Sequence, residues 1–350
     1  MKDKYLILKG CAGLGNRFIT LMKALQYSKL SGREICVDWS DGMFAAPGVN
    51  TFDEYFNLKY DKKATLEQIK YAFTNGRSTY PKNIVAEDFD RPIYPESNIE
   101  SSFKVFTPKL ASNTIYKVGL SIIPLHKIVY LLGLQSFQRP YKMEDMSWWK
   151  AVKTMNDGNN LPLGSNLWPW LKADIVFFAD FRPWCPMKRF SETVTLKEKY
   201  QNIIDSKAKE MNLANAIGVH VRYTDKKPKQ QLNVLLKRLG KDLDNGTKIF
   251  LCTDNKDIEI DFKEEFGNKV IMTEKYIPEV KGEGIHIWAS FQNDDNLKRQ
   301  MFEDSLIDMW LLSKCKFLYW QGNSAFSMIS KLLLNDKQRC MDWLTIKTKD

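Results

Sequence analysis

Two kinds of apolar pattern alternate near the N-terminal end of the chain. The runs YLILK at 5–9 and EICVDW at 34–39 are short and continuous, which predicts two buried strands. Between them, from 18 to 30, apolar residues such as Leu21 and Leu25 recur at the spacing of one helix face. Strand, glycine-containing turn, helix and strand make a βαβ unit, whose crossover predicts that the two strands are parallel.

The same alternation returns over a longer stretch in the C-terminal half. Short apolar runs predict strands at 216–221, 248–252, 269–273 and 316–320. Helical spacing predicts helices at 195–211, 231–243, 258–266, 299–315 and 325–334. Such alternation is typical of an α/β domain with a parallel sheet. We therefore predict two Rossmann-like α/β domains, at 1–190 and 191–350, whose parallel sheets face a cleft.

The region from 50 to 190 shows no regular pattern of apolar residues. Its helices and strands therefore cannot be predicted from the sequence. It is rich in prolines and aromatic residues. We expect its tryptophans to be core residues, and stacking on the sugar rings of an acceptor is the alternative. These tryptophans are Trp148, Trp149, Trp168, Trp170 and Trp184.

The composition indicates a folded protein that does not span a membrane. An apolar fraction of 44% with 13% aromatic residues can fill hydrophobic cores, which excludes a disordered chain. The most apolar window, 115–134, is interrupted by lysines and a proline, and the first apolar run is too short for a signal peptide. The six cysteines show no C-x-x-C spacing, which favours free thiols in a reducing compartment. We therefore expect a cytoplasmic protein.

The formal net charge of +10 favours an anionic partner. Nucleic acid, a membrane surface and a phosphorylated substrate all satisfy that condition. The lysines are spread along the chain, which disfavours nucleic acid. We therefore expect a phosphorylated small-molecule substrate, no nucleic-acid partner and at most peripheral contact with a membrane.

Polar or glycine-rich segments follow four of the predicted strands. Ligands of open parallel sheets bind beyond the carboxyl ends of the strands, so these segments are the candidate site. They are GCAGLGNR at 10–17, HVRYTDKK at 220–227, CTDN at 252–255 and WQGNSAF at 320–326.

The first of these segments has glycines at 10, 13 and 15, which is neither a Walker loop nor G-x-G-x-x-G. A plain turn is one interpretation. The other is a backbone that approaches a nucleotide or a sugar with exposed N–H groups. In that case Gly13, Gly15 and Asn16 would face the ligand, and Arg17 would add a fixed cation.

The second segment places His220 and Arg222 on the same side of a strand, because strand residues alternate. The guanidinium of Arg222 suits a diphosphate through bidentate, charge-assisted hydrogen bonds. A structural role is the ordinary alternative for a single histidine.

The last two segments offer weaker signals. Thr253 and Asp254 end a strand, where a carboxylate can accept hydrogen bonds from ribose or a base edge. Asn323 or Ser324 precedes a strong helix and would cap it. The start of a helix is also a phosphate site, because its N–H groups are free.

In these four segments the sequence resembles the GDP-fucose-dependent fucosyltransferases. GLGNRF, followed by a helix and a strand ending in VDW, is similar to the α-1,2 and rhizobial nodulation branches. GVHVRYTDK resembles the H-x-R-x-x-D-K motif of the α-1,6 branch, and IFLCTDN resembles a strand of that branch. FEDSLIDMWLLSKCKFLYWQGNSAFS resembles the last motif of the family. The matches fall in the family's order and cover roughly residues 5–40 and 215–335.

The resemblance implies a GT-B fold with an acceptor-side N-terminal domain and a C-terminal donor domain. It implies inverting, metal-independent transfer from GDP-fucose, or a related GDP-sugar, to a hydroxyl of a glycan such as a bacterial surface polysaccharide. No cofactor is implied. By position, Arg222 would hold the β-phosphate, Asp254 the nucleoside, and Asn323 with Ser324 the diphosphate. His220 would brace the strand end or touch the donor, and Gly13 and Gly15 would face the donor from the other domain.

The resemblance leaves the catalytic base open. Tyr223 stands where the family pattern has a second arginine, and Gln230 where the α-1,6 branch has its glutamate base. A neutral amide cannot take a proton. Asp225 is the nearest candidate in sequence, and Asp38, Glu303 and Asp304 are alternatives. A metal-dependent transferase would use Asp88 and Asp90, which form a D-x-D triplet.

Overall fold

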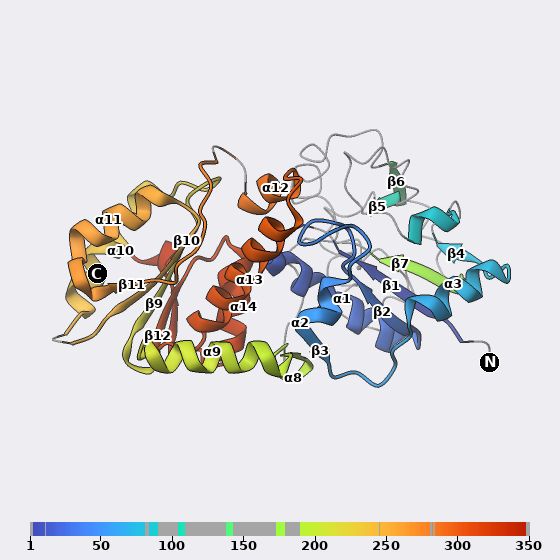
Figure 1. Ribbon diagram of the computed structural model, residues 1–350, viewed down its shortest axis with the longest axis horizontal. Coiled ribbons are helices and arrows are strands. Elements are labelled where there is room, and N and C mark those ends of the chain that lie inside the picture. Colours follow the sequence, from blue (N-terminus) through green and yellow to red (C-terminus); the bar gives the residue numbers. More distant parts are fainter. Residues whose placement is uncertain are drawn as a thin grey trace.

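The computed structural model describes most of both halves of the chain. The described residues are 3–10, 12–80, 84–89, 104–108, 138–142, 173–178, 190–244, 246–280, 282 and 284–347. The five tryptophans of the middle region and Asp90 lie outside them. Figure 1 shows two parallel sheets at opposite ends of the molecule, with helices between them.

The N-terminal sheet has four parallel strands in the order β2-β1-β7-β4. They are β1 (Tyr5–Lys9), β2 (Glu34–Asp38), β4 (Thr79–Tyr80) and β7 (Ile175–Phe178). Helix α1 (Leu14–Ser31) connects β1 to β2, so the predicted βαβ unit is confirmed. The irregular region contributes β4 and β7, which the sequence pattern did not predict.

The C-terminal sheet has five parallel strands in the order β11-β10-β9-β12-β13. They are β9 (Ile217–Val221), β10 (Ile249–Thr253), β11 (Val270–Ile271), β12 (Phe317–Trp320) and β13 (Cys340–Asp342). The first four match the predicted strands, whereas β13 was not predicted. The order reverses between β9 and β12, and such a switch point opens a crevice beyond the strand ends.

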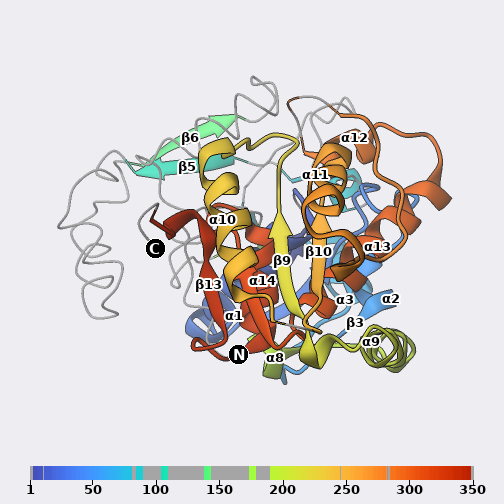
Figure 2. The same ribbon diagram turned by 90° about the vertical axis from the view of Figure 1, so that its left-hand side faces the viewer.

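The remaining elements connect and cover these sheets (Figure 2). In the N-terminal half they are α2 (Thr51–Tyr55), β3 (Phe56–Leu58), α3 (Leu66–Thr74), η1 (Ala86–Phe89) and the antiparallel pair β5 (Lys104–Pro108) and β6 (Gln138–Lys142). In the C-terminal half they are α8 (Phe190–Thr193), β8 (Val194–Leu196), α9 (Glu198–Glu210), η5 (Leu213–Asn215), α10 (Lys229–Asp242), α11 (Lys256–Phe266), η6 (Gly267–Lys269), α12 (Ile285–Ser290), α13 (Asp295–Leu312), α14 (Ala325–Leu334) and η7 (Trp343–Thr345).

One hydrophobic core joins the two halves. Residues of β1 and α1 belong to the same buried cluster as residues of α13, α14 and β10. Figure 1 shows α13 and α14 between the two sheets, beside α1. The central strands are buried on both faces, which explains why they read as continuous apolar runs. The cavity described below therefore lies between two halves that pack on each other.

The predicted boundary at 190 falls close to a crossover between the halves. Strand β8 follows that position, yet it pairs antiparallel with β3 of the N-terminal half. The predicted helix at 195–211 is consequently shorter, because its first residues belong to β8 and α9 begins at Glu198. The division into domains at 190 stays a prediction.

Within the described part of the chain, no helix combines the length and the apolar character needed to cross a membrane.

Candidate functional site

A cavity lies where the carboxyl ends of β9 and β10 meet the beginnings of α1 and α14. Helices α12 and α13 close its other sides. It contains eight of the ten predicted donor-binding residues, from both halves of the chain. These are Gly13, Gly15, Asn16, His220, Arg222, Thr253, Asp254 and Ser324.

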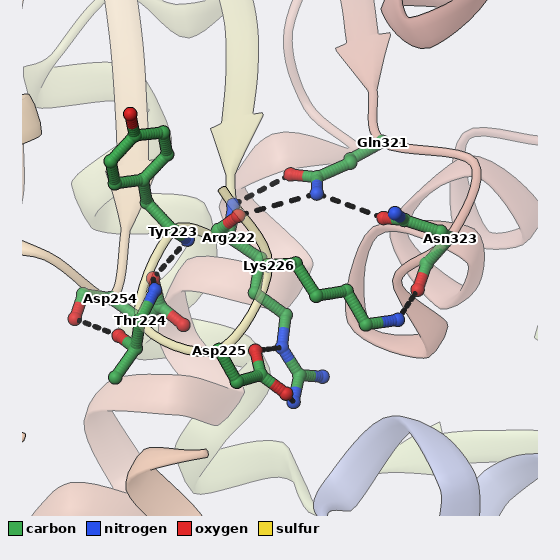
Figure 3. Close-up of polar contacts among 8 residues, drawn as sticks. All are labelled: Arg222, Tyr223, Thr224, Asp225, Lys226, Asp254, Gln321 and Asn323. Atoms are coloured by element: carbon green, nitrogen blue, oxygen red, sulfur yellow. Dashed lines mark hydrogen bonds and ion pairs between the residues drawn. The ribbon is translucent and has the colours of Figure 1, made fainter. Parts of the chain in front are cut away.

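Arg222 follows β9 and is held to the end of β12 by a buried glutamine. The Gln321 side chain accepts a hydrogen bond from the Arg222 N–H at 2.7 Å and donates one to the Arg222 carbonyl at 3.3 Å. Gln321 also donates to the Asn323 side chain at 2.8 Å (Figure 3). These bonds fix the two loops of the switch point to each other, and with them the position of Arg222.

The guanidinium of Arg222 is engaged by Asp225. Arg222 Nε and Nη2 donate to the two carboxylate oxygens at 2.6 Å each (Figure 3). Burial raises the pKa of Asp225, but the hydrogen bonds and the charge of Arg222 outweigh burial and leave the pKa lowered. Both carboxylate oxygens of Asp225 are engaged by Arg222, and Asp225 does not line the cavity. Asp225 thus orients Arg222 in this structure, and its role as the base stays a prediction.

Asp254 holds the loop that carries Arg222. Its Oδ1 accepts hydrogen bonds from the N–H groups of Tyr223 at 2.6 Å and Thr224 at 3.2 Å. The Thr224 hydroxyl donates to the Asp254 carbonyl at 2.8 Å (Figure 3). Burial raises the pKa of Asp254 despite these bonds. Asp254 lines the cavity and positions the loop that carries Arg222, and its contact with a nucleoside stays a prediction.

The beginning of α14 is open towards the cavity. Ser324 is the N-cap residue, yet its side chain makes no capping bond, and its buried Oγ has no partner among the described residues. The first N–H groups of a helix lack intrahelical acceptors, so this end carries unfilled donors and partial positive charge. Asn323 does not line the cavity, because its side chain binds Gln321 and its carbonyl accepts from Lys226.

His220 lies beside this helix end as a neutral ring. It is 6% exposed and stacks on Phe326 with ring centroids 4.9 Å apart. Burial, and then the charge of Arg222, lower its pKa to about 3. Its Nδ1 is buried with no partner among the described residues. An orphan nitrogen at the wall of a cavity is suited to a bond with a ligand.

Arg17 does not line the cavity, which corrects its prediction as a donor-binding cation. It is 1% exposed, and its guanidinium forms a fork on Asp41 at 3.0 and 2.5 Å. Its Nε donates to the Ala12 carbonyl at 2.9 Å. Ala12 has a φ of 60°, a conformation that alanine seldom adopts. Arg17 therefore fixes the shape of the glycine loop by its hydrogen bond to the Ala12 carbonyl.

The glycines of that loop allow close approach to protein, not only to a ligand. A Cβ on Gly15 would lie 2.5 Å from the Ala325 carbonyl carbon, and a Cβ on Gly13 would lie 3.2 Å from the His286 ring. Gly15 has no room for a side chain, because backbone atoms lie against it, whereas at Gly13 a Cβ would require a small shift of the His286 ring. Gly13 and Gly15 line the cavity, as predicted. Their nearest neighbours, however, are residues of α12 and α14.

Substituting alanine at Gly15 is expected to separate α1 from α14. The added methyl would collide with backbone atoms, which cannot rotate away, so the cost is that of overpacking, about 1–3 kcal/mol. Chemical denaturation measures the loss. Gly240→Ala on α10 is the matched control, because a Cβ there meets nothing within 4 Å. Equal stability of the two variants would show that the halves are not in contact at Gly15.

Helix α13 contributes two carboxylates to the cavity, Asp304 and Asp308, which the lysines Lys275 and Lys298 accompany. Asp308 of α13 accepts from Thr273 and Lys275 at 2.5 Å each. Asp304, one turn earlier, lines the same cavity, and its Oδ2 is buried without a partner among the described residues. Burial, and then the charge of Asp308, raise the pKa of Asp304 to about 6. One of the two carboxylates is thus saturated, and the other is free for a ligand.

The remaining predicted bases are engaged elsewhere. Asp38 pairs with Lys9 at 2.6 Å within the N-terminal core. Glu303 accepts from Tyr55 at 2.7 Å and from Tyr200 at 3.1 Å. Neither residue lines the cavity, so of these alternatives only Asp304 does.

Sequence reasoning gave no site role to several cavity residues, among them His286 and Lys275. Both lie in the long connection after β11, where no periodic pattern marks a strand end. The glycines at 282 and 284 beside His286 were the available signal. Among the described residues, no group of three or more His, Cys, Asp or Glu side chains could hold a metal, and Asp90 lies outside them.

Comparisons with known proteins establish the fold. No family model and no curated protein sequence matches the chain. NodZ α-1,6-fucosyltransferase soaked with GDP-fucose superposes with a TM-score of 0.56 at 18% identity, over 95% of this chain and 93% of that chain. Fucosyltransferase NodZ from Bradyrhizobium gives a TM-score of 0.56 at 18% identity, over 95% and 94%. NodZ co-crystallized with GDP gives 0.56 at 17%, over 95% and 93%. The chain therefore has the GT-B fold of these fucosyltransferases, which confirms the predicted fold class.

Proposed function

We propose that the protein transfers fucose from GDP-fucose to a hydroxyl of a glycan, with inversion at the sugar carbon. The observation that carries this proposal is a set of groups suited to an anion at the switch point of a parallel sheet, namely an arginine whose fork is held by Asp225 and groups without partners among the described residues. Arg222, the open beginning of α14 and the orphan Nδ1 of His220 surround one cavity. Such a set is suited to a diphosphate. The similar NodZ structures, which hold GDP and GDP-fucose, support this assignment.

The proposed chemistry follows from the charge that develops on the leaving group. As the sugar becomes cation-like and its bond to the diphosphate breaks, negative charge accumulates on the β-phosphate. Arg222 and the N–H groups of α14 would stabilise that charge without reorganising. We propose that this arrangement replaces a divalent ion and that the enzyme requires no metal. The acceptor we propose is a cytoplasmic precursor of a surface polysaccharide or a related oligosaccharide.

The carboxylates that α13 contributes to the cavity favour guanine among the nucleobases. Guanine presents N1–H and N2–H₂ side by side, and a carboxylate can accept both bonds at once. Adenine has no such pair of donors, and uracil presents a single N–H between two carbonyls. Asp304 offers a carboxylate with a free Oδ2, whereas Asp308 is saturated by Thr273 and Lys275. We propose that Asp304 binds the guanine.

This role makes guanine recognition depend on pH. The pKa of Asp304 in the free protein is raised to about 6. Only the carboxylate accepts both guanine donors, so the preference for GDP over ADP is expected to fall about tenfold from pH 7 to pH 5. Calorimetric titration with GDP and with ADP gives this ratio. Protonation of the phosphates affects both nucleotides equally, so it does not change the ratio. Asp304→Asn is expected to lower the ratio about 10–100-fold at pH 7 and to remove its pH dependence. A ratio that is the same in both proteins at every pH would remove Asp304 from guanine recognition.

The experiment that tests the function has three stages, which measure nucleotide preference, sugar preference and transfer activity. Thermal-shift measurements compare GDP with UDP, ADP and CMP, and then GDP-fucose with GDP-mannose. Transfer to a panel of oligosaccharides is then followed by release of GDP, with and without EDTA. Stabilisation by GDP-fucose and EDTA-resistant transfer are expected. Tighter binding of UDP would contradict a GDP-sugar donor. Loss of transfer in EDTA, restored by manganese, would contradict metal independence.

A second candidate function is binding of a GDP-sugar without catalysis. The glutamine at the position of the family's base favours it, and Gln230 lies exposed on α10, away from the cavity. The two functions are separated by one measurement, release of GDP when GDP-fucose and an acceptor are both present. Binding without release, for every acceptor and GDP-sugar, would favour the sensor.

A further inference from the structure

His286 occupies the wall between the two halves of the chain. It belongs to α12 and lines the cavity opposite the glycine loop. Its ring fits between two glycines. A Cβ on Gly13 would lie 3.2 Å from its Cγ and Nδ1, and a Cβ on Gly284 would lie 2.7 Å from its Cε1. Gly13 and Gly284 have negative φ values, so space for the ring, not backbone conformation, accounts for glycine at both positions.

The ring lies at the Arg222 end of the cavity. The position of a Cβ on Gly284 is 2.9 Å from His286 Nδ1 and 3.1 Å from Arg222 Nη2, so these two nitrogens are at most about 6 Å apart. No hydrogen bond from a described residue reaches either ring nitrogen. The nitrogens therefore remain available to a ligand that Arg222 also contacts.

The surroundings keep the imidazole neutral. Burial, and then the positive charge of Arg222, lower the pKa of His286 to about 3, with Asp225 opposing and Arg17 adding to this effect. The free ring thus carries a lone pair on one nitrogen. A diphosphate bound at Arg222 would bring negative charge to this end, which favours the protonated ring. The site is therefore arranged so that the donor itself makes the ring a better base.

Asp304 is surrounded by other charged groups than His286. The charged groups that act on Asp304 are chiefly Asp308, Lys275 and Glu303, whereas those that act on His286 are Arg222, Asp225 and Arg17. In a nucleoside diphosphate sugar the reacting carbon is attached to the β-phosphate, far from the base. A general base must be within reach of the hydroxyl that attacks this carbon. A base near the Arg222 guanidinium meets this requirement, and His286 lies there.

We propose that His286 is the catalytic base that deprotonates the acceptor, a role that rests on the proposed function. The acceptor oxygen forms a bond to the anomeric carbon of the donor sugar, and the bond from that carbon to the β-phosphate oxygen breaks. The electron pair of the broken bond leaves with GDP. The hydroxyl proton moves to the free imidazole nitrogen and passes to solvent after the products leave.

The test uses the full chain with His286→Gln, which keeps a polar side chain but has no basic nitrogen. Binding of GDP is expected to fall far less than transfer, because Arg222 and the beginning of α14 remain to hold the diphosphate. Transfer from GDP-fucose to an oligosaccharide is expected to lose about 10²–10⁴-fold in kcat. Azide needs no deprotonation, so it should restore GDP release and form fucosyl azide in the variant.

His286→Phe is the matched control, because it keeps an aromatic ring between the two glycines without a basic nitrogen. Full transfer by His286→Phe, or unchanged transfer by His286→Gln, would overturn the proposal and leave the proposed function intact. The proposal also fails if both variants lose GDP binding in parallel with transfer, or if azide restores nothing. An original protein that binds no GDP and transfers no sugar would instead overturn the proposed function.

Discussion

Replacing Arg222 by alanine is expected to lower the turnover of GDP-fucose by about 10²–10³-fold, the effect of losing one transition-state donor. Gln321 holds the backbone of Arg222 on both sides, so the loop keeps its position when the side chain is removed. The loss should therefore fall on kcat more than on the thermal stability of the free protein. Steady-state release of GDP, with the midpoint of thermal unfolding measured beside it, checks both expectations.

The ion pair with Asp225 provides the control for this result. Arg222→Lys keeps the charge but loses the fork, so its turnover should lie between the alanine variant and the original protein. Asp225→Asn keeps Arg222 and weakens its intramolecular partner, so donor affinity should stay the same or rise. Unchanged turnover in Arg222→Ala would remove Arg222 from the mechanism. A fall in Asp225→Asn as large as that in Arg222→Ala would instead assign Asp225 a direct role.

The substitution Arg17→Met is expected to destabilise the fold by about 3–5 kcal/mol. It removes a fully buried guanidinium and leaves the carboxylate of Asp41, which is 6% exposed, without its cation. It also frees the Ala12 carbonyl at a backbone position with a φ of 60°. Urea denaturation measures the free energy of unfolding, and the glycine loop should lose its fixed shape.

Two controls separate the buried charge from the loss of a side chain. Lys314→Met breaks an exposed ion pair with Asp205 and should cost less than about 1 kcal/mol. In the double variant Arg17→Met with Asp41→Leu no buried charge is left unpaired, so it should be more stable than Arg17→Met alone. A cost for Arg17→Met no larger than for Lys314→Met would show that the pair is not buried in solution. If Arg17→Met lost activity but kept its stability, Arg17 would have to be assigned to donor binding after all.

The two substitutions distinguish the two uses of arginine in this chain. Both arginines follow a strand of a parallel sheet, and both form a fork on an aspartate. The Arg222 side chain is 20% exposed at the cavity, whereas the Arg17 side chain is fully buried. The first can exchange its aspartate for a phosphate, and the second cannot without unfolding its surroundings. Position relative to the cavity, not residue type or local motif, decides the role.

The sequence by itself determined the two parallel sheets and the edge at which the cavity lies. Strands buried on both faces must be continuously apolar, so β1, β9, β10 and β12 were visible as short runs. The carboxyl ends of parallel strands meet at one edge, so polar segments after these strands had to converge. The short strands β4 and β13 lie outside such runs and were not predictable, because neighbouring strands define them. Strand β7 is such a run, IVFF, but it was overlooked within the irregular region.

Only the tertiary structure decided which polar groups remain free for a ligand. The sequence supplies a guanidinium or a carboxylate, but its partner is chosen by packing across the chain. Arg17 is neutralised by Asp41, the fork of Arg222 is held by Asp225, and Asn323 is engaged by Gln321. The groups left without partners, in Ser324, His220 and Asp304, became visible only when all their neighbours were placed. His286 lies in the segment after β11, which shows no periodic sequence pattern. It lines the cavity because Gly13 and Gly284 leave room for its ring.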